Sequence, residues 1–307
     1  MKAGLNMISY KGLEAKLDER GITRSDLTKE LGISSRTIAK IGRGEKLSRV
    51  VMEKLCGYFS CTAAELCCEI SDNPILQTLR EEKAAKISGG LYHELQVRMT
   101  YNSNHIEGSR LTEDQTRLIF ETNTLDAGDG VPVDDILETV HHFRAIDYVI
   151  DCAEDVLTEE IVKELHFILK RDTKDSTLDW FAVGDYKKRP NVVGGRETTK
   201  PKDVPAQMKA LLDAYNAKRE VTIHDIIAFH AEFEKIHPFQ DGNGRVGRLV
   251  ALKECLRFNI VPFLIEDSKK AFYYRGLSEW ETEKGWLTDT CLDGQDTFKR
   301  LLAMFEL

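Results

Sequence analysis

The sequence predicts a mainly α-helical protein, with a five-helix N-terminal domain followed by a larger all-α domain that carries one short β-hairpin. Three observations support this fold class. Apolar residues recur at helical spacing along most of the 307 residues. A short polar break, Ser71-Asp72-Asn73-Pro74, interrupts that pattern. The stretch 184–200 departs from it, with β-branched residues around Gly194-Gly195, as a hairpin does.

Composition and charge are typical of a soluble globular chain, with 42% hydrophobic and 31% charged residues. No run of 18 apolar residues could span a bilayer, and the N-terminus lacks the apolar core of a signal peptide. The seven cysteines form no CxxC pair, so we expect reduced thiols, no zinc site and a cytoplasmic protein. The net charge of −8 is uneven, because residues 1–70 carry +3 and the remainder −11.

The N-terminal domain is expected at residues 7–70, since the helical pattern begins just after Met7. Five short helices are predicted there. Tyr10, Leu13 and Leu17 share one face of the first helix. Gly32 provides the tight turn between the second and third helices.

A helix, a glycine-containing turn and a second helix within a small bundle are typical of a helix-turn-helix domain. The segment ITRSDLTKELGISSRTIAKIGRGEKLS resembles the Cro/repressor-like family. The resemblance implies that the third helix reads DNA, with contacts from Ser35, Arg36, Thr37, Lys40 and Arg43. A bundle used for protein contact is the alternative, because the excess charge of +3 is only weak support for DNA.

The larger domain is expected at residues 75–307. Its helices are predicted at 75–87, 91–104, 112–121, 133–153, 158–170, 203–216, 223–235, 244–258, 267–281 and 293–305.

The most informative stretch lies between two of these helices and reads HPFQDGNGRVGR, from His237 to Arg248. Its glycines allow backbone N–H groups to turn toward an anion at the start of a helix. Two arginines at i and i+3 share a helix face and could bind successive phosphates. The chemistry therefore predicted is a proton acceptor, a Mg²⁺ ligand and two phosphate-binding cations, at His237, Asp241, Arg245 and Arg248 respectively.

This stretch resembles the HPFxDGNGRxxR signature of the Fic family at every fixed position. The resemblance implies transfer of AMP from ATP to a protein hydroxyl group, with release of pyrophosphate. His237 would take the proton from a Ser, Thr or Tyr hydroxyl, Asp241 would ligate Mg²⁺, and Phe239 would anchor the loop. The phosphates would be bound by Gly242, Asn243, Gly244, Arg245 and Arg248. Family members often form homodimers, so a homodimer is a further expectation.

The hairpin at about 184–200 would correspond to the family's flap, which pairs with an extended segment of the target protein. Its docking edge would comprise Lys188, Pro190, Val192, Val193 and Gly194. A plain surface hairpin is the alternative. Tyr273 and Tyr274 would flank the adenine, although an aromatic pair on a helix is also typical of a core. The remaining histidines lack metal-ligand spacing and are interpreted as packing or surface residues: His141, His142, His166, His224 and His230.

The segment Ser103-Asn104-His105-Ile106-Glu107-Gly108 matches the [ST]xxxE[GN] motif of autoinhibited Fic proteins, within a predicted inhibitory helix at about 91–108. Ser103 and Glu107 lie four residues apart, on one helix face. The resemblance implies that Glu107 pairs with Arg248 and so removes the partner of the γ-phosphate.

The function predicted is a self-restrained protein adenylyltransferase, a nucleotidyltransferase that uses ATP and Mg²⁺ and acts on another protein or on itself. A de-AMPylase or a bifunctional enzyme, with Glu107 aligning water, stays open. The phosphotransferase branch of the family is disfavoured by Gly244 and Arg248. A DNA-binding regulator that only senses nucleotide is disfavoured by His237 and Asp241, since sensing needs no base.

Overall fold

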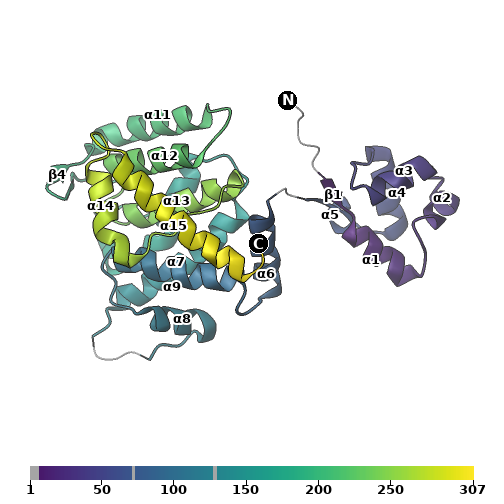
Figure 1. Cartoon of the computed structure of the whole chain (residues 1–307), viewed down its shortest axis with the longest axis horizontal. Coiled ribbons are helices and arrows are strands. Elements are labelled where there is room, and N and C mark those ends of the chain that lie inside the picture. The colour runs from purple at the N-terminus through teal and green to yellow at the C-terminus, as the bar shows by residue number, and fades with distance from the viewer. Residues whose placement is uncertain (1–6, 71–72, 127–129) are drawn as a thin grey trace. The chain divides into compact units, whose positions relative to one another are not determined.

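The computed structural model describes residues 7–70, 73–126 and 130–307. The chain divides into two compact units, Met1–Pro74 and Ile75–Leu307, and each is described by itself (Figure 1). The predicted fold class is confirmed: both units are mainly helical, and the larger one carries a short β-hairpin.

The smaller unit contains the five predicted helices and, in addition, a two-stranded antiparallel sheet. The sheet pairs the two ends of the unit, with Met7 opposite Ile70 and Ser9 opposite Cys68. The sequence did not predict it, because three residues are too few to show an alternating pattern. The elements are β1 (Met7–Ser9), α1 (Lys11–Arg20), α2 (Asp26–Leu31), α3 (Ser35–Gly42), α4 (Arg49–Phe59), α5 (Ala63–Leu66) and β2 (Cys68–Ile70).

The core of the smaller unit is formed by the apolar faces that the sequence indicated. Leu13 and Leu17 of α1 pack with Leu27, Leu55 and Leu66, and all five are almost fully buried. Helix α1 ends at Gly21, whose left-handed backbone at φ +66° favours glycine. This core fixes the orientation of α3, whose outer face carries the predicted DNA contacts.

The larger unit is a helical assembly around α13, which contacts α7, α9, α10 and α12. In Figure 1, α7 and α9 lie side by side in the lower half of this unit with α8 beneath them, while α11 and α12 lie above. Its helices are α6 (Pro74–Ala85), α7 (Leu91–Ile106), α8 (Glu113–Thr122), α9 (Val133–Asp151), α10 (Glu159–Lys170), α11 (Val204–Asn216), α12 (Ile223–Ile236), α13 (Asn243–Arg257), α14 (Lys270–Ser278) and α15 (Gly285–Met304).

The prediction was wrong at the last two helices. The stretch 267–281 is a 3₁₀ turn at Asp267–Lys269 followed by α14, and α15 begins at Gly285 instead of 293. Helix α15 continues through Gly294, where a Cβ atom would lie 2.7 Å from the carbonyl oxygen of Leu264. This glycine therefore permits a close approach of two backbones and does not end a helix.

The predicted hairpin is present as β3 (Val192–Val193) and β4 (Arg196–Glu197), joined through Gly194 and Gly195 in the left-handed region. The six cysteines whose side chains are described are free thiols. Among the residues that the structure describes, no helix is long and apolar enough to cross a membrane.

Candidate active site

The HPFQDGNGRVGR stretch forms the connection between α12 and α13. His237 follows the last residue of α12 with a left-handed backbone, φ +52°, which is uncommon for a residue other than glycine. Gly242 is also left-handed, at φ +80°, and α13 begins at the next residue. The two left-handed residues turn the chain so that the N-terminus of α13 lies in the same loop as the His237 side chain.

The loop is held by its own side chains and by His166 of α10. Phe239 is fully buried and its ring stacks on that of His166, with centroids 4.0 Å apart, as its predicted anchoring role requires. His166 Nδ1 accepts a hydrogen bond from Gly184 N–H, so the proton lies on Nε2, which donates to the Asp241 carbonyl oxygen at 3.2 Å. Burial lowers the pKa of His166 to about 3, so the ring is neutral.

Asn243, predicted to help bind the phosphates, uses its side chain within the loop. Its Oδ1 accepts from Phe239 N–H at 2.8 Å and its Nδ2 donates to the Phe239 carbonyl at 2.9 Å. The side chain thus closes the loop with both of its polar atoms, and the backbone N–H of Asn243 is available for an anion. The first backbone hydrogen bond of α13 runs from the Val246 N–H to the Gly242 carbonyl. The N–H groups before Val246 therefore have no acceptor within the helix and can face an anion.

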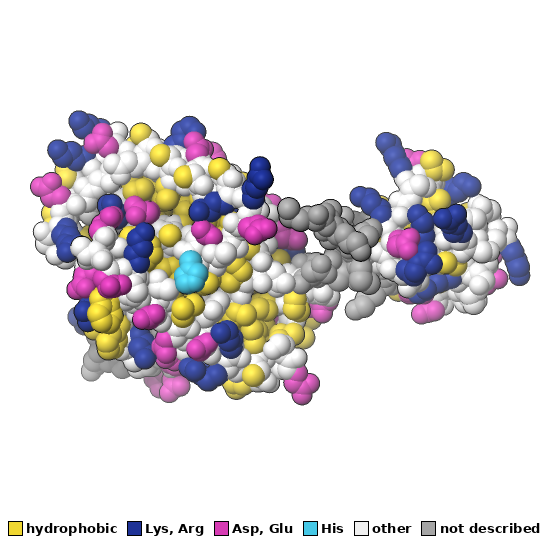
Figure 2. Space-filling view, turned by 45° about the horizontal axis from the view of Figure 1, so that its top comes forward, with side chains coloured by type: hydrophobic (Ala, Val, Ile, Leu, Met, Phe, Trp, Pro, Cys, Tyr) yellow, Lys and Arg dark blue, Asp and Glu magenta, His cyan; other side chains and the backbone are white. Residues whose placement is uncertain are grey.

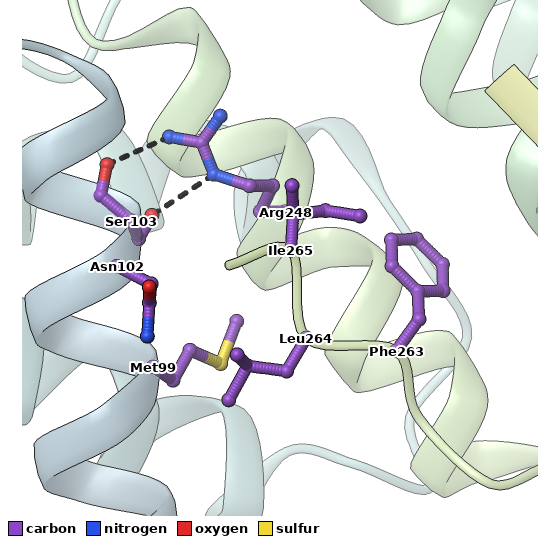
Figure 3. Close-up of a pocket in the computed structure, with 7 residues that line it drawn as sticks. All are labelled: Met99, Asn102, Ser103, Arg248, Phe263, Leu264 and Ile265. Carbon is purple, nitrogen blue, oxygen red and sulfur yellow. Dashed lines mark hydrogen bonds between the residues drawn. The ribbon is translucent and has the colours of Figure 1, made fainter. Parts of the chain in front are cut away.

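Arg248 is the centre of a first charge cluster, which we define as Arg248, Glu107, Ser103 and Tyr273. Arg248 donates to Ser103 Oγ (3.0 Å), the Ser103 carbonyl (2.9 Å), Glu107 Oε1 (2.7 Å) and Tyr273 Oη (3.3 Å). Figure 3 shows Ser103 and Arg248 facing each other between α7 and α13. The neighbouring cavity has a volume of only about 10 Å³, which is room for about one water, so Arg248 and Ser103 are packed closely together.

The Glu107 carboxylate also covers the start of α13. A Cβ atom on Gly244 would lie 2.2 Å from Glu107 Oε1, so the carboxylate rests directly against the glycine backbone. A helix N-terminus attracts anions, and here the anion is a side chain of the same chain. The sequence expectation that Glu107 pairs with Arg248 agrees with this geometry.

A second charge cluster joins the loop to α9 and α10, and we define it as Asp241, Arg245, Lys170 and Glu138. Asp241 Oδ2 accepts from Lys170 Nζ at 2.6 Å and from Arg245 Nη2 at 3.3 Å. Glu138 accepts from Lys170 Nζ at 2.6 Å and from Arg245 Nη1. Burial disfavours the charged carboxylate of Asp241, but Arg245 and Lys170 overcome this and hold the pKa of Asp241 below its ordinary value.

Asp241 fits the predicted Mg²⁺ ligand in chemistry and exposure. Its carboxylate is a hard oxygen donor, and its side chain is 51% exposed although its partners are buried. The described residues contain no group of three or more His, Cys, Asp or Glu that could hold a metal by themselves.

His237 is electrostatically suited to accept a proton. Burial, followed by the positive charge of Lys187, lowers the pKa of His237 to about 4. The imidazole is therefore neutral at physiological pH. Glu234, one turn earlier in α12, has Oε2 4.0 Å from His237 Nδ1, and burial together with Glu107 raises the pKa of Glu234 to about 8.

The two tyrosines do not match the predicted adenine contacts equally. Tyr273 is fully buried, and its hydroxyl contacts Arg248 and His230 Nε2 (2.7 Å), so in this structure its ring belongs to the core. Tyr274 is 39% exposed and its hydroxyl donates to the carbonyl of Ile106, next to Glu107. Of the pair, only Tyr274 is open to solvent.

The predicted docking edge of the hairpin is exposed. Val192 and Val193 are 62% and 46% exposed, which is uncommon for valines on a strand. Lys188, Pro190 and Gly194 are exposed as well. An unpaired hairpin edge with exposed apolar side chains is available for pairing with an extended peptide.

The predicted DNA contacts lie on α3 and just after it. Ser35, Arg36 and Arg43 are exposed, while Thr37 and Lys40 are partly exposed. Ser34 caps the helix by accepting from Thr37 N–H. Figure 2 shows several Lys and Arg side chains gathered on the visible face of this unit.

Several residues of the site were missed by the sequence interpretation: Glu138, Lys170, His166, Lys187 and Glu234. Each of them contacts the loop or changes its electrostatics. Four lie on other elements of the larger unit, and Glu234 lies one turn before the loop on α12. His166 was interpreted as a packing residue; it packs, but it also donates to the loop backbone. No local pattern marks these residues, because their partners are mostly 30 or more positions away in the sequence.

Comparison with known proteins agrees with this arrangement. The sequence profile of the Fic/DOC family matches residues 156–255, and that of the Cro/C1-type HTH DNA-binding domain matches residues 13–69. A solved Fic domain containing signaling protein from Bacteroides thetaiotaomicron is similar, with 26% identity, a TM-score of 0.57, and coverage of 75% of this chain and 88% of that one. Fic-1 from C. elegans has the same fold, with 21% identity, a TM-score of 0.59, and coverage of 76% and 71%.

Curated relatives are called protein adenylyltransferase Fic. The one from Drosophila willistoni is 29% identical over 180 residues, which is 58% of this chain and 35% of that protein. The one from Aedes aegypti is 27% identical over 190 residues, 59% of this chain and 36% of that protein. The chain thus spans about a third of the length of these relatives. Profile, fold and site geometry agree that this protein carries a Fic/DOC family domain preceded by a Cro/C1-type helix-turn-helix domain.

Proposed function

We propose that the chain transfers AMP from ATP to a hydroxyl side chain of a protein, and that Glu107 restrains this activity. The proposal rests mainly on one observation. His237, which is neutral and largely buried, lies in the loop that leads into the N-terminus of α13, and the first turns of that helix carry Arg245 and Arg248. The adenylyltransferase relatives support the same reaction.

The reaction forms a bond between the hydroxyl oxygen and the α-phosphorus and breaks the bond from the α-phosphorus to the bridging oxygen. His237 receives the hydroxyl proton, and pyrophosphate leaves. The N–H groups at the start of α13 bind the phosphate oxygens, Arg245 faces the β-phosphate and Arg248 the γ-phosphate. Mg²⁺, held by Asp241 and the phosphates, would neutralise charge on the leaving group.

The restraint follows from the first charge cluster. Arg248 cannot bind a γ-phosphate while it holds Glu107, and the Glu107 carboxylate occupies the anion position at Gly244. Two negative groups cannot share that position without strong repulsion. ATP that entered would therefore sit with its α-phosphate out of line for attack.

The test uses ATP labelled at the α- or the γ-phosphate, incubated with the protein and a cell lysate in the presence of Mg²⁺. The wild type, Glu107→Gly and His237→Ala variants are compared. Label from the α-position should appear on protein, more with Glu107→Gly, and should fall by about 10²–10⁴-fold with His237→Ala. Transfer of γ-label would show phosphotransfer instead, and release of AMP from pre-labelled protein would show de-AMPylation.

A second proposed function is DNA binding by the smaller unit. The observation that favours it is the exposed basic face of α3 in a unit that the DNA-binding profile covers. Binding would fall steeply with salt, because Lys and Arg release counterions from phosphates. Replacing Arg36 and Lys40 by Ala should weaken binding and flatten the salt slope, whereas Lys16→Ala on α1 should not. Absence of any DNA shift at low salt would favour a protein-contact role.

A further inference from the structure

The base of the hairpin contains a buried ammonium group with no carboxylate partner. Lys187 is 3% exposed, and its Nζ donates to Asn191 Oδ1 (2.8 Å), Thr198 Oγ1 (2.6 Å) and the Ile236 carbonyl (3.5 Å). All three acceptors are neutral. Among the residues that the structure describes, no carboxylate forms an ion pair with this nitrogen or shifts its pKa.

Such an arrangement is costly, since burial of an uncompensated charge disfavours folding. Burial lowers the pKa of Lys187 to about 8, yet this value still leaves most of the lysine charged at neutral pH. A methionine would fill similar space without that cost. The charge therefore has a use that fold stability does not explain.

The contacts of this lysine join the hairpin to the catalytic loop. Its backbone N–H donates to the Pro238 carbonyl at 2.9 Å. Asn191 Nδ2 donates to the carbonyls of Phe239 (3.2 Å) and Gln240 (3.4 Å). Thr198, on the far side of the hairpin, bonds back to Asn191 through both its hydroxyl and its N–H. The segment before β3 is thus attached directly to the backbone that follows His237, and the segment after β4 is attached to it through Asn191.

We propose that Lys187, Asn191 and Thr198 form a clamp that fixes the hairpin to the catalytic loop, and that the Lys187 charge makes it a positioning residue for His237. The clamp sets the distance between a peptide docked on β3 and the proton acceptor. The ammonium adds to the effect of burial in disfavouring protonation of the imidazole. The proposal rests on the proposed function, in which His237 is the base.

The groups that face His237 are of both signs. Lys187 comes from the hairpin base, Glu234 from α12, Glu107 from the end of α7 and Asp241 from the loop itself. Lys187 is the only cation among these four, and its charge opposes protonation, whereas Glu107 and Asp241 favour it. Removing the lysine charge leaves carboxyl groups alone around the imidazole, so the pKa of His237 should rise.

Two measurements without substrate test the clamp, so their failure is distinct from an absence of AMP transfer. The first is amide hydrogen exchange of the full chain. In Lys187→Met, exchange should become faster both in the hairpin and at residues 237–242, and the exposed control Lys202→Met should match the wild type. Thr198→Val removes one acceptor of Lys187 and the hydroxyl donor to Asn191 but keeps the lysine, so it should show a smaller change in the same two segments. Unchanged exchange at 237–242 in Lys187→Met would overturn the clamp.

The second measurement is NMR titration of His237. In Lys187→Met the pKa of His237 should rise toward its ordinary value, and in Lys187→Arg, which keeps the charge, it should remain low. A purely structural lysine would not produce this difference. The positioning role would be overturned if Met and Arg shifted the pKa equally, or if neither shifted it.

Discussion

The two charge clusters at the loop both pair carboxylates with buried cations, but they differ in the number of carboxylates that each cation binds. In the first, one carboxylate, Glu107, binds one arginine whose other partners are a neutral hydroxyl, a carbonyl and a phenol. In the second, two carboxylates and two cations balance one another, and each carboxylate binds both cations. Three of the four members of the second cluster have nearly buried or buried side chains, whereas Glu107 is 27% exposed.

We therefore interpret the Glu107–Arg248 contact of the first cluster as replaceable by another anion, and the second cluster as part of the structural scaffold of the loop. If Glu107 leaves, Arg248 keeps its contacts with Ser103 and Tyr273 and becomes free to bind another anion. If Glu138 leaves the second cluster, two buried cations share Asp241, and Lys170 retains Asp175 at 3.7 Å. We therefore expect loss of stability from the second cluster and gain of activity from the first.

The largest effect should come from Glu138→Gln. It leaves Arg245, 4% exposed, with Asp241, and Lys170, 3% exposed, with Asp241 and the more distant Asp175, so we expect a loss of about 3–5 kcal/mol in the free energy of unfolding. Tryptophan fluorescence in denaturant reports it, since Trp180, Trp280 and Trp286 all lie in the larger unit. Asp213→Asn, which breaks an exposed i,i+4 pair with Lys209, is the control and should cost less than about 0.5 kcal/mol. Equal losses would remove the distinction between the clusters.

The pH dependence of AMP transfer tests how Glu107 and Asp241, one from each cluster, change the pKa of His237. With the pKa of His237 at about 4, the base stays neutral down to low pH and loses activity only as the pH falls through that value. At pH 5, kcat/KM should be about 30-fold higher than for a histidine with the ordinary pKa. Because the Glu107 carboxylate favours the imidazolium, Glu107→Gln should move the acid limb to still lower pH. An acid limb near 6.5 in both proteins would contradict this assignment.

A smaller stability effect is expected for Glu107→Gln. Arg248 loses one charged hydrogen bond but keeps the others, so the loss should be about 1.5–3 kcal/mol, below that of Glu138→Gln. AMP transfer should nevertheless increase, since the anion position is no longer occupied by a charge. If Glu107→Gln instead lowered AMP transfer together with stability, Glu107 would be a structural residue and not a restraint.

The smallest effect should come from Ser103→Ala. It removes the hydroxyl acceptor of Arg248 Nε, but the Ser103 carbonyl and Glu107 remain, so the loss should be about 0.5–1.5 kcal/mol. AMP transfer should rise less than in Glu107→Gln. A larger rise than in Glu107→Gln would make Ser103, and not the carboxylate, the principal restraint.

The sequence predicted the residues that share a local motif. His237, Asp241, Gly242, Arg245 and Arg248 lie within twelve positions, and helical geometry alone places both arginines near the loop. Glu107 was predicted because its own short motif is local as well. Its contact with Arg248, across 141 positions, was inferred through resemblance and agrees with the geometry.

The sequence did not predict what tertiary packing determines. Lys170, Glu138 and Lys187 carry no motif, and a lysine on a predicted helix is ordinarily exposed. Asn243 was assigned to phosphate through the family resemblance, and the loop uses both polar atoms of its side chain. Tyr273 was assigned to adenine, but it is buried against Arg248 and His230. Both cases have the same cause: a sequence does not show how many of a side chain's polar atoms the fold already uses.

The most direct test of the central claim is the rate of AMP transfer from α-labelled ATP in four proteins. They are the wild type, Glu107→Gly, Arg248→Ala and the double variant. Glu107→Gly should raise the rate by about 5- to 150-fold, the range of a typical coupling between sites. In the double variant that gain should disappear, because the restraint and the γ-phosphate share the same guanidinium. An unchanged rate in Glu107→Gly, or a gain that persists without Arg248, would contradict the account.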